Sequence, residues 1–165
     1  MPLTTFSSLP PRARVWVFAC DRSLTHDESQ SLLAQVDPYL AQWKAHGAPL
    51  LSAREWGDDR FLVVGIDPTA EQASGCSIDD LFRRLRDVGV SLGTQMLGSG
   101  RVFYRDARGT VQSVSRAEFS ARAARGDVTS DTTVFDTSVI VAEDWRERFE
   151  RRAGEAWTAE LLAVN

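Results

Sequence analysis

The chain has 165 residues, of which 43% are hydrophobic and 25% are charged, and its formal net charge at pH 7 is −4. This length suits one domain with a real hydrophobic core, or a domain with a small extension, and argues against two full domains. The net negative charge and the scattering of basic residues among acidic ones argue against nucleic-acid binding, which uses a continuous basic surface. We therefore expect no nucleic-acid partner.

The chain contains two cysteines, Cys20 and Cys76, and two histidines, His26 and His46. Two cysteines are too few for a disulfide-stapled secreted protein or for a cysteine-based zinc site. The N-terminal residues lack the basic and apolar regions of a signal peptide, and no apolar run is long enough to span a membrane. We expect a cytoplasmic protein that binds no metal ion or cofactor and does not enter the membrane.

The first part of the chain predicts three strands. Residues 1–13 are polar and contain two consecutive prolines, which indicates an N-terminal tail. Residues 14–20 and 61–66 are nearly uninterrupted apolar runs, a pattern typical of strands covered on both faces. A strand over about 49–56 begins with proline, which favours a sheet edge, and Gly57-Asp58-Asp59 predicts a hairpin that joins it to strand 61–66.

Two helices are predicted from capping residues and apolar stripes. Thr25 and Glu28 form a capping box for a first helix that Gly47 ends. A second helix is predicted to begin at Ser77 and to end at Gly89. The apolar stripe of this second helix consists of Ile78, Leu81, Phe82, Leu85 and Val88.

The last third of the chain predicts a hairpin over residues 101–114, a short helix that begins at Ser115, and a strand over 133–141. Aromatic residues between Trp145 and Trp157 indicate a C-terminal helical segment over residues 142–165. Whether the hairpin continues the first sheet or starts another one is left open by the pattern.

The order β-α-β-β-α-β over residues 14–106 is that of a split β-α-β, ferredoxin-like unit, so the predicted fold class is α+β. A β-α-β extension over residues 107–141 follows this unit. We expect strands 14–20 and 61–66 to be parallel neighbours, so that their carboxyl ends and both helix starts share one edge of the sheet. This edge is predicted to gather the candidate ligand-binding residues Asp21, Arg22, His26, Asp67, Cys76 and Ser77, with Cys20 beside them.

Three functions remain open for this edge. Helix N-termini favour anions, so the first is a non-enzymatic binding or regulatory protein whose ligand is an anion or a small metabolite. The second is a thiol enzyme or redox sensor that uses Cys76, with Cys20 as a resolving partner. The third is a structural homodimer that pairs through sheet edges and the segment containing Trp145 and Trp157.

Several runs resemble a known family, namely residues 8–17, Asp21-Arg22 and residues 73–79, 104–106 and 134–136. They are similar to a family of short, uncharacterised bacterial proteins, some of which carry an automatic label of transporter ATPase. The resemblance spans nearly the whole chain and implies a bacterial protein, but it implies no catalytic residues.

Two further sequence patterns bear on function. The glycine-rich run 93–100 lacks the lysine of a phosphate-binding loop and follows a helix, so we expect a flexible connection and no ATPase activity. Residues 103–136 resemble GYF-type peptide-binding modules, although they lack the Gly-Pro-Tyr-Phe signature.

Overall fold

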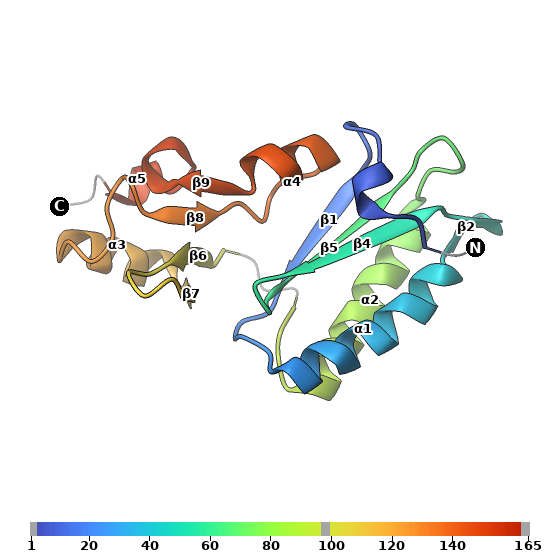
Figure 1. Cartoon of the computed structure of the whole chain (residues 1–165), viewed down its shortest axis with the longest axis horizontal. Helices are drawn as coiled ribbons and strands as arrows, with labels where there is room; N and C mark the ends of the chain where they lie inside the picture. The colour runs from blue at the N-terminus through green and yellow to red at the C-terminus, as the bar shows by residue number, and fades with distance from the viewer. Residues whose placement is uncertain (1–2, 97–99, 163–165) are drawn as a thin grey trace.

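A computed structural model of the chain describes residues 3–96 and 100–162. It is an α+β protein in which two lobes lie end to end (Figure 1). The first lobe contains β1 (Val15–Ala19), α1 (His26–Ala41), β2 (Lys44–Ala45), β3 (Ala48–Pro49), β4 (Ser52–Gly57), β5 (Phe61–Ile66) and α2 (Gly75–Leu92). The second lobe contains β6 (Val102–Arg105), β7 (Val111–Val114), α3 (Arg116–Ala124), β8 (Thr133–Phe135), α4 (Ala142–Arg148), β9 (Glu150–Arg152) and α5 (Ala159–Leu162).

The sheet of the first lobe has the strand order β1-β5-β4, and both pairs are antiparallel. The prediction that β1 and β5 are neighbours is confirmed, but the prediction that they are parallel is wrong. The physical reason lies in the two connections. The tight hairpin reverses β5 relative to β4, and the helical crossover makes β1 and β4 parallel. Because β5 lies between β1 and β4, it is antiparallel to both. The carboxyl ends of β1 and β5 therefore lie at opposite ends of the sheet.

The hairpin between β4 and β5 is formed as predicted. Asp58 and Asp59 both have positive φ angles, 55° and 53°, as a two-residue type I′ turn requires. The N–H of Arg60 donates to the carbonyl of Gly57 over 3.1 Å and closes the turn. This short connection fixes the register of the central strand β5, whose six residues are all buried.

The two long helices cover one face of this sheet (Figure 1) and pack on it through one apolar cluster. The capping box of Thr25 is confirmed, but α1 ends at Ala41 and not at Gly47, because the chain then forms the small β2–β3 hairpin. The second helix begins one turn earlier than predicted. Its N-cap is Ser74, and Ser77 closes the capping box from inside the helix.

The second sheet has the order β7-β6-β8-β9 and is antiparallel throughout. The fourth strand predicted for the ferredoxin-like unit, residues 102–105, is β6 of this second sheet, so the predicted hairpin starts a new sheet. The C-terminal segment that was predicted as helical also contains strand β9 between α4 and α5. Helices α3 and α5 pack against each other and bury Phe119 and Tyr104 on one face of the second sheet.

An aromatic cluster joins the two lobes. The ring of Phe61, at the start of β5, lies 5.4 Å from that of Phe103, 4.9 Å from that of Phe135 and 5.0 Å from that of Phe149 between centroids. All four side chains are buried in one cluster that includes Ala19 of β1. Because residues of both lobes share this cluster, the lobes pack through an apolar contact and not only through the connecting chain.

The N-terminal tail contributes to the core as well. Phe6, Leu9 and Ala13 are buried against the face of the first sheet that the long helices leave free. Of the predicted connection 93–100, residues 97–99 lie outside the described residues. Within the described part of the chain, no helix has the length and apolar composition that crossing a membrane requires.

Candidate functional site

The structure divides the predicted site residues into two groups. Asp21, Arg22 and His26 lie between the end of β1 and the start of α1, whereas Asp67, Cys76 and Ser77 lie between the end of β5 and the start of α2. Since β1 and β5 are antiparallel, these groups lie at opposite ends of the lobe. The length of α2, about 27 Å for 18 residues, separates them.

In the first group, the polar side chains are already engaged within the protein. The guanidinium of Arg22 donates to the carboxylate of Glu28 over 2.5 Å and to the carbonyl of Leu92 over 2.7 Å, and the first bond lowers the pKa of Glu28. Asp21 accepts a hydrogen bond of 2.6 Å from the hydroxyl of Thr94. These bonds pin the β1–α1 loop to the end of α2, and His26 is exposed on the first turn of α1.

The second group is also engaged, with the exception of Cys76. Asp67 accepts hydrogen bonds from the N–H and the hydroxyl of Thr69, and these bonds lower its pKa. Ser77 exchanges hydrogen bonds with Ser74 at the start of α2. Both long helices therefore have N-termini whose free N–H groups are partly satisfied by capping side chains, which leaves fewer donors for an anion.

The two cysteines do not form the predicted thiol pair. Cys20 lies at the end of the lobe where α2 finishes and is buried, and burial raises the pKa of its thiol to about 12. Cys76 lies on the first turn of α2 and is exposed. The length of α2 separates them, far beyond the limit of about 7 Å between Cα atoms in a disulfide. Both are free cysteines, so Cys20 is not a resolving partner of Cys76.

We expect the two thiols to react at very different rates with iodoacetamide at pH 8. Cys76 should be alkylated in the native protein, whereas Cys20 should react only after unfolding, because its thiol is buried and stays protonated. Mass spectrometry of peptides from native and urea-unfolded protein measures both rates. Equal rates in the native protein would contradict the burial of Cys20.

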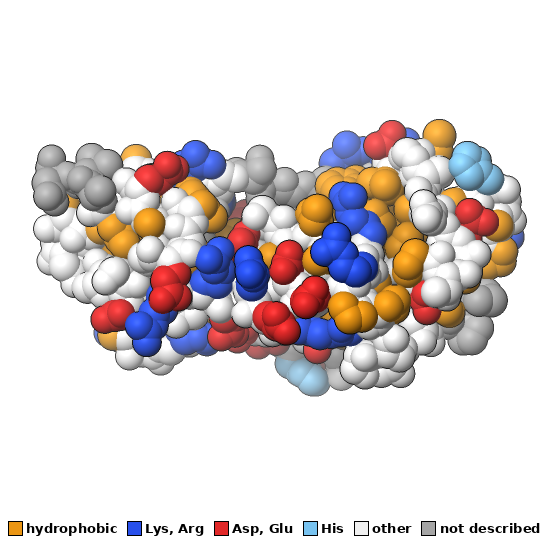
Figure 2. Space-filling view, turned by 90° about the horizontal axis from the view of Figure 1, so that it is seen from above, with side chains coloured by type: hydrophobic (Ala, Val, Ile, Leu, Met, Phe, Trp, Pro, Cys, Tyr) orange, Lys and Arg blue, Asp and Glu red, His pale blue; other side chains and the backbone are white. Residues whose placement is uncertain are grey.

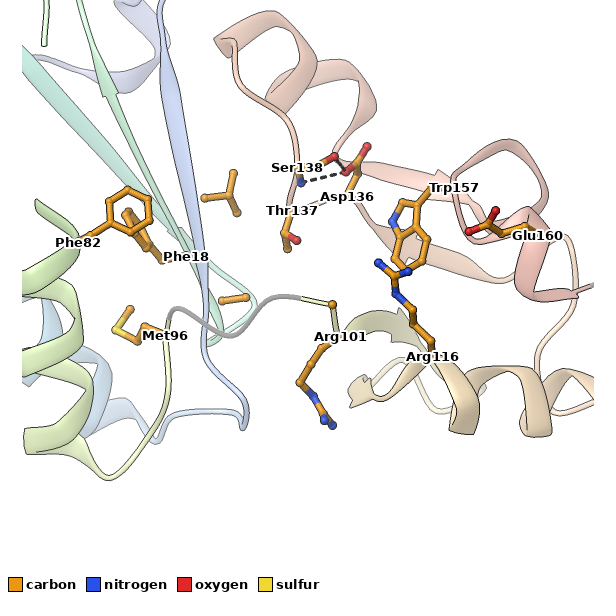
Figure 3. Close-up of a pocket in the computed structure, with 13 residues that line it drawn as sticks. Phe18, Phe82, Met96, Arg101, Arg116, Asp136, Thr137, Ser138, Trp157 and Glu160 are labelled. Atoms are coloured by element: carbon orange, nitrogen blue, oxygen red, sulfur yellow. Dashed lines mark hydrogen bonds between the residues drawn. The ribbon is translucent and has the colours of Figure 1, made fainter. Parts of the chain in front are cut away.

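A cleft that sequence analysis did not anticipate lies between the lobes. It has a volume of about 610 Å³ and is lined by residues of β1, α2, α3 and α5 and of the segments that follow α2, β8 and β9 (Figure 3). Its first wall is apolar and belongs to the first lobe. Phe82 of α2 is 38% exposed, and its ring contacts that of the buried Phe18 edge-on at 5.3 Å, with Met96 also lining the cleft.

The opposite wall carries two arginines. The guanidinium of Arg116, the first residue of α3, stacks over the indole ring of Trp157 at 4.9 Å. The guanidinium of Arg101 donates to the hydroxyl and the carbonyl of Ser113, each over 2.8 Å. Among residues 3–96 and 100–162, neither arginine has a carboxylate within 4.0 Å.

The acidic residues of the cleft do not neutralise these arginines. Asp136 accepts a 3.0 Å hydrogen bond from the N–H of Ser138, and its carboxylate lies 4.0 Å from the guanidinium of Arg151. Glu160 lies on the far side of Trp157 from the apolar wall (Figure 3). The cleft therefore combines an apolar wall with two positively charged groups that lack acidic partners in the part of the chain that the structure describes.

The described residues offer little to a metal ion, because no three histidine, cysteine or acidic side chains among them are grouped as ligands. Basic and acidic side chains are also interspersed on the face that Figure 2 presents, so that face carries no continuous basic stripe. Comparison of the chain with family models, curated proteins and solved structures finds no match.

Proposed function

We propose that the protein is a non-enzymatic ligand-binding protein, and that its ligand is a small anion with an apolar part that occupies the cleft between the lobes. The observation that carries the proposal is that Arg101 and Arg116, which have no carboxylate partner among residues 3–96 and 100–162, line one cavity together with Phe18 and Phe82. Their guanidinium groups point in different directions, that of Arg116 toward Trp157 and that of Arg101 away from it, so each would meet a different part of a ligand (Figure 3). Unpaired guanidinium groups at the rim of an apolar cavity are suited to a carboxylate.

Both arginines are held in place before a ligand arrives. Stacking on Trp157 restrains Arg116, and two hydrogen bonds to Ser113 restrain Arg101. Restrained side chains lose less conformational entropy on binding, so more of the interaction energy contributes to affinity. Hydrogen bonds to charged groups contribute about 1.5–3 kcal/mol each, so one arginine accounts for roughly a 10- to 150-fold change in affinity.

The cleft fits a ligand of this kind better than the two helix N-termini do. A volume of about 610 Å³ lies within the range of roughly 300–1,000 Å³ that is usual for small-molecule sites. At the helix starts, Arg22, Asp67 and Ser77 are bonded to neighbouring residues. We therefore place the predicted anion at the cleft, and we propose a regulatory or carrier role in the cytoplasm of a bacterium.

The shape of the cleft follows from the incomplete first sheet. We propose that the first lobe is a ferredoxin-like unit without its fourth strand, because β1, α1, β4, β5 and α2 follow that order and strand β6 pairs elsewhere. The place of the fourth strand, beside β1, opens into the cleft, since Val17 and Ala19 of β1 line it.

Thiol chemistry at Cys76 is the second candidate, and the exposure of this residue on the first turn of α2 favours it. The two candidates are separable, because Cys76 does not line the cleft. Replacing Cys76 with serine would abolish a thiol activity and leave ligand binding in the cleft unchanged. Self-association, the third possibility, would appear as a concentration-dependent mass in light scattering.

The test is a thermal-shift screen with carboxylic acids that carry an apolar group, beside their neutral amides. A ligand at 100 times its Kd stabilises by about 2.7 kcal/mol, which raises the Tm by roughly 5–11 °C in a domain of this size. We expect the acids to raise the Tm and the amides to leave it unchanged. Variants R101Q and R116Q should weaken binding at least tenfold.

The matched control is R83Q, because Arg83 is an exposed arginine of α2 that does not line the cleft. It should bind the acids as the unmodified protein does. An absence of any shift, or a shift that persists in both cleft variants, would contradict the proposal.

A further inference from the structure

The cleft between the lobes has three parts that differ in chemistry (Figure 3). Phe18 and Phe82 of the first lobe form the apolar part. Arg116 forms the second part, and its guanidinium points toward Trp157. Arg101 forms the third part, and its guanidinium points away from Trp157. A ligand that fills the cleft therefore meets two cations at different places.

Both guanidinium groups keep N–H groups that a ligand can use. The guanidinium of Arg116 lies over the indole ring of Trp157, and none of its N–H groups has a hydrogen-bond partner in the described part of the chain. Arg101 donates from Nε and from one terminal nitrogen to Ser113, so among the same residues its other terminal nitrogen has no partner. Free N–H groups of a planar guanidinium form charge-assisted hydrogen bonds with a carboxylate.

A single carboxylate cannot pair with both arginines, because their guanidinium groups point apart (Figure 3). A second carboxylate on the same ligand gains the second pairing without a second loss of translational freedom, since the first pairing already holds the ligand in the cleft. Each pairing changes the affinity roughly 10- to 150-fold. A ligand with two separate carboxylates therefore uses the cleft better than a ligand with one.

We propose that the ligand of the cleft is a dicarboxylate with an apolar substituent. One carboxylate pairs with Arg116 and the other with Arg101, and the substituent packs against Phe18 and Phe82. The proposal rests on the proposed function and names the ligand class of the same site. The two carboxylates neutralise two cations that have no carboxylate within 4.0 Å in the described part of the chain. The substituent covers the part of the Phe82 ring that the protein leaves exposed.

The experiment uses the full chain and isothermal titration calorimetry with N-phenylacetyl-glutamate, whose phenyl group is the apolar substituent. Two monoamides of the same shape, N-phenylacetyl-glutamine and N-phenylacetyl-isoglutamine, each keep one carboxylate, whereas N-acetyl-glutamate keeps both but lacks the ring. We expect the dicarboxylate to bind at least tenfold more tightly than each of these three probes. The corresponding derivatives of aspartate and of 2-aminoadipate shorten and lengthen the spacing of the carboxylates by one methylene.

The variants R101Q and R116Q assign each carboxylate to its arginine. Each variant should lower the affinity for the dicarboxylate at least tenfold, because one pairing is lost. Each should leave unchanged the binding of the monoamide that lacks the carboxylate for that arginine, so the two monoamides respond to the two variants in opposite ways. The matched control R83Q, at an exposed arginine of α2 that does not line the cleft, should bind every probe as the unmodified protein does.

The outcomes distinguish this inference from the proposed function. If none of the three dicarboxylates binds more tightly than its own monoamides, the inference is overturned and the site for a single anion stands. The inference is also overturned if R101Q or R116Q leaves the affinity for the tightest dicarboxylate unchanged, because the ligand then uses one arginine alone. If no probe binds and the thermal-shift screen finds no acid that raises the Tm, both the inference and the proposed function fail.

Discussion

Replacing Phe61 with alanine is expected to lower the free energy of unfolding by about 3–5 kcal/mol. The side chain is fully buried, and its ring contacts those of Phe103, Phe135 and Phe149 from the second lobe. Its removal leaves a cavity that belongs to neither lobe alone. We therefore expect the variant to lose the single cooperative transition and to unfold in two steps.

Urea unfolding monitored by far-UV circular dichroism measures the loss of unfolding free energy in F61A. Differential scanning calorimetry shows whether the variant unfolds in one transition or in two. The control is F119A, because Phe119 is fully buried within the second lobe and is not part of the shared aromatic cluster. F119A should lower the free energy of unfolding by a similar amount, but the two lobes should still unfold in one transition. A loss for F61A below about 1 kcal/mol, the level of an average substitution, would contradict a joining role of the cluster.

Replacing Gly89 with alanine is expected to destabilise the protein by about 1–3 kcal/mol, although alanine is the better helix former. A Cβ atom at this position of α2 would lie 2.7 Å from the carbonyl oxygen of Thr94. The chain turns back at this point, and the N–H of Thr94 donates to the carbonyl of Gly89 over 2.9 Å. The clash is with backbone, so the segment after the helix has to move.

The same substitution at Gly75 serves as the control, since no atom lies within 4 Å of the Cβ that would be added there. G75A should be neutral or should stabilise by about 0.4–1 kcal/mol, because it restricts the unfolded chain. Thermal unfolding of both variants measures the contrast. G89A should also weaken cleft binding, because the displaced segment leads to Met96. Equal effects of the two substitutions would contradict the close approach at Gly89.

Local features of the fold were predictable from the sequence. The strand over residues 61–66, the Asp58-Asp59 turn and the capping box of Thr25 depend on neighbouring residues, so short patterns identify them. The position of the N-cap of α2 was missed, because Ser74 and Ser77 both fit a cap. The alternative that forms is the one in which the side chain of each serine accepts a hydrogen bond from the backbone N–H of the other.

The candidate site was less predictable, because it depends on how distant elements pack. The sequence grouped Asp21 with Asp67 on the assumption of parallel strands, and the antiparallel pairing of β1 with β5 places them apart. The arginines of the cleft have no local signature, since Arg101 and Arg116 have the sequence context of ordinary surface residues. Only the second sheet, which packs against the end of the first, brings them opposite Phe82.

The pairing of β1 with Ile140 has a consequence for synthesis on the ribosome. Ile66 completes the first sheet, but Ile140 follows 74 residues later in the chain. At a translation rate of about 5–20 residues per second, roughly 4–15 s pass between them. During this interval the nascent first lobe has an open strand edge and an uncovered Phe61, two features that promote aggregation. We expect the yield of folded protein in cells to depend on chaperones that bind nascent chains.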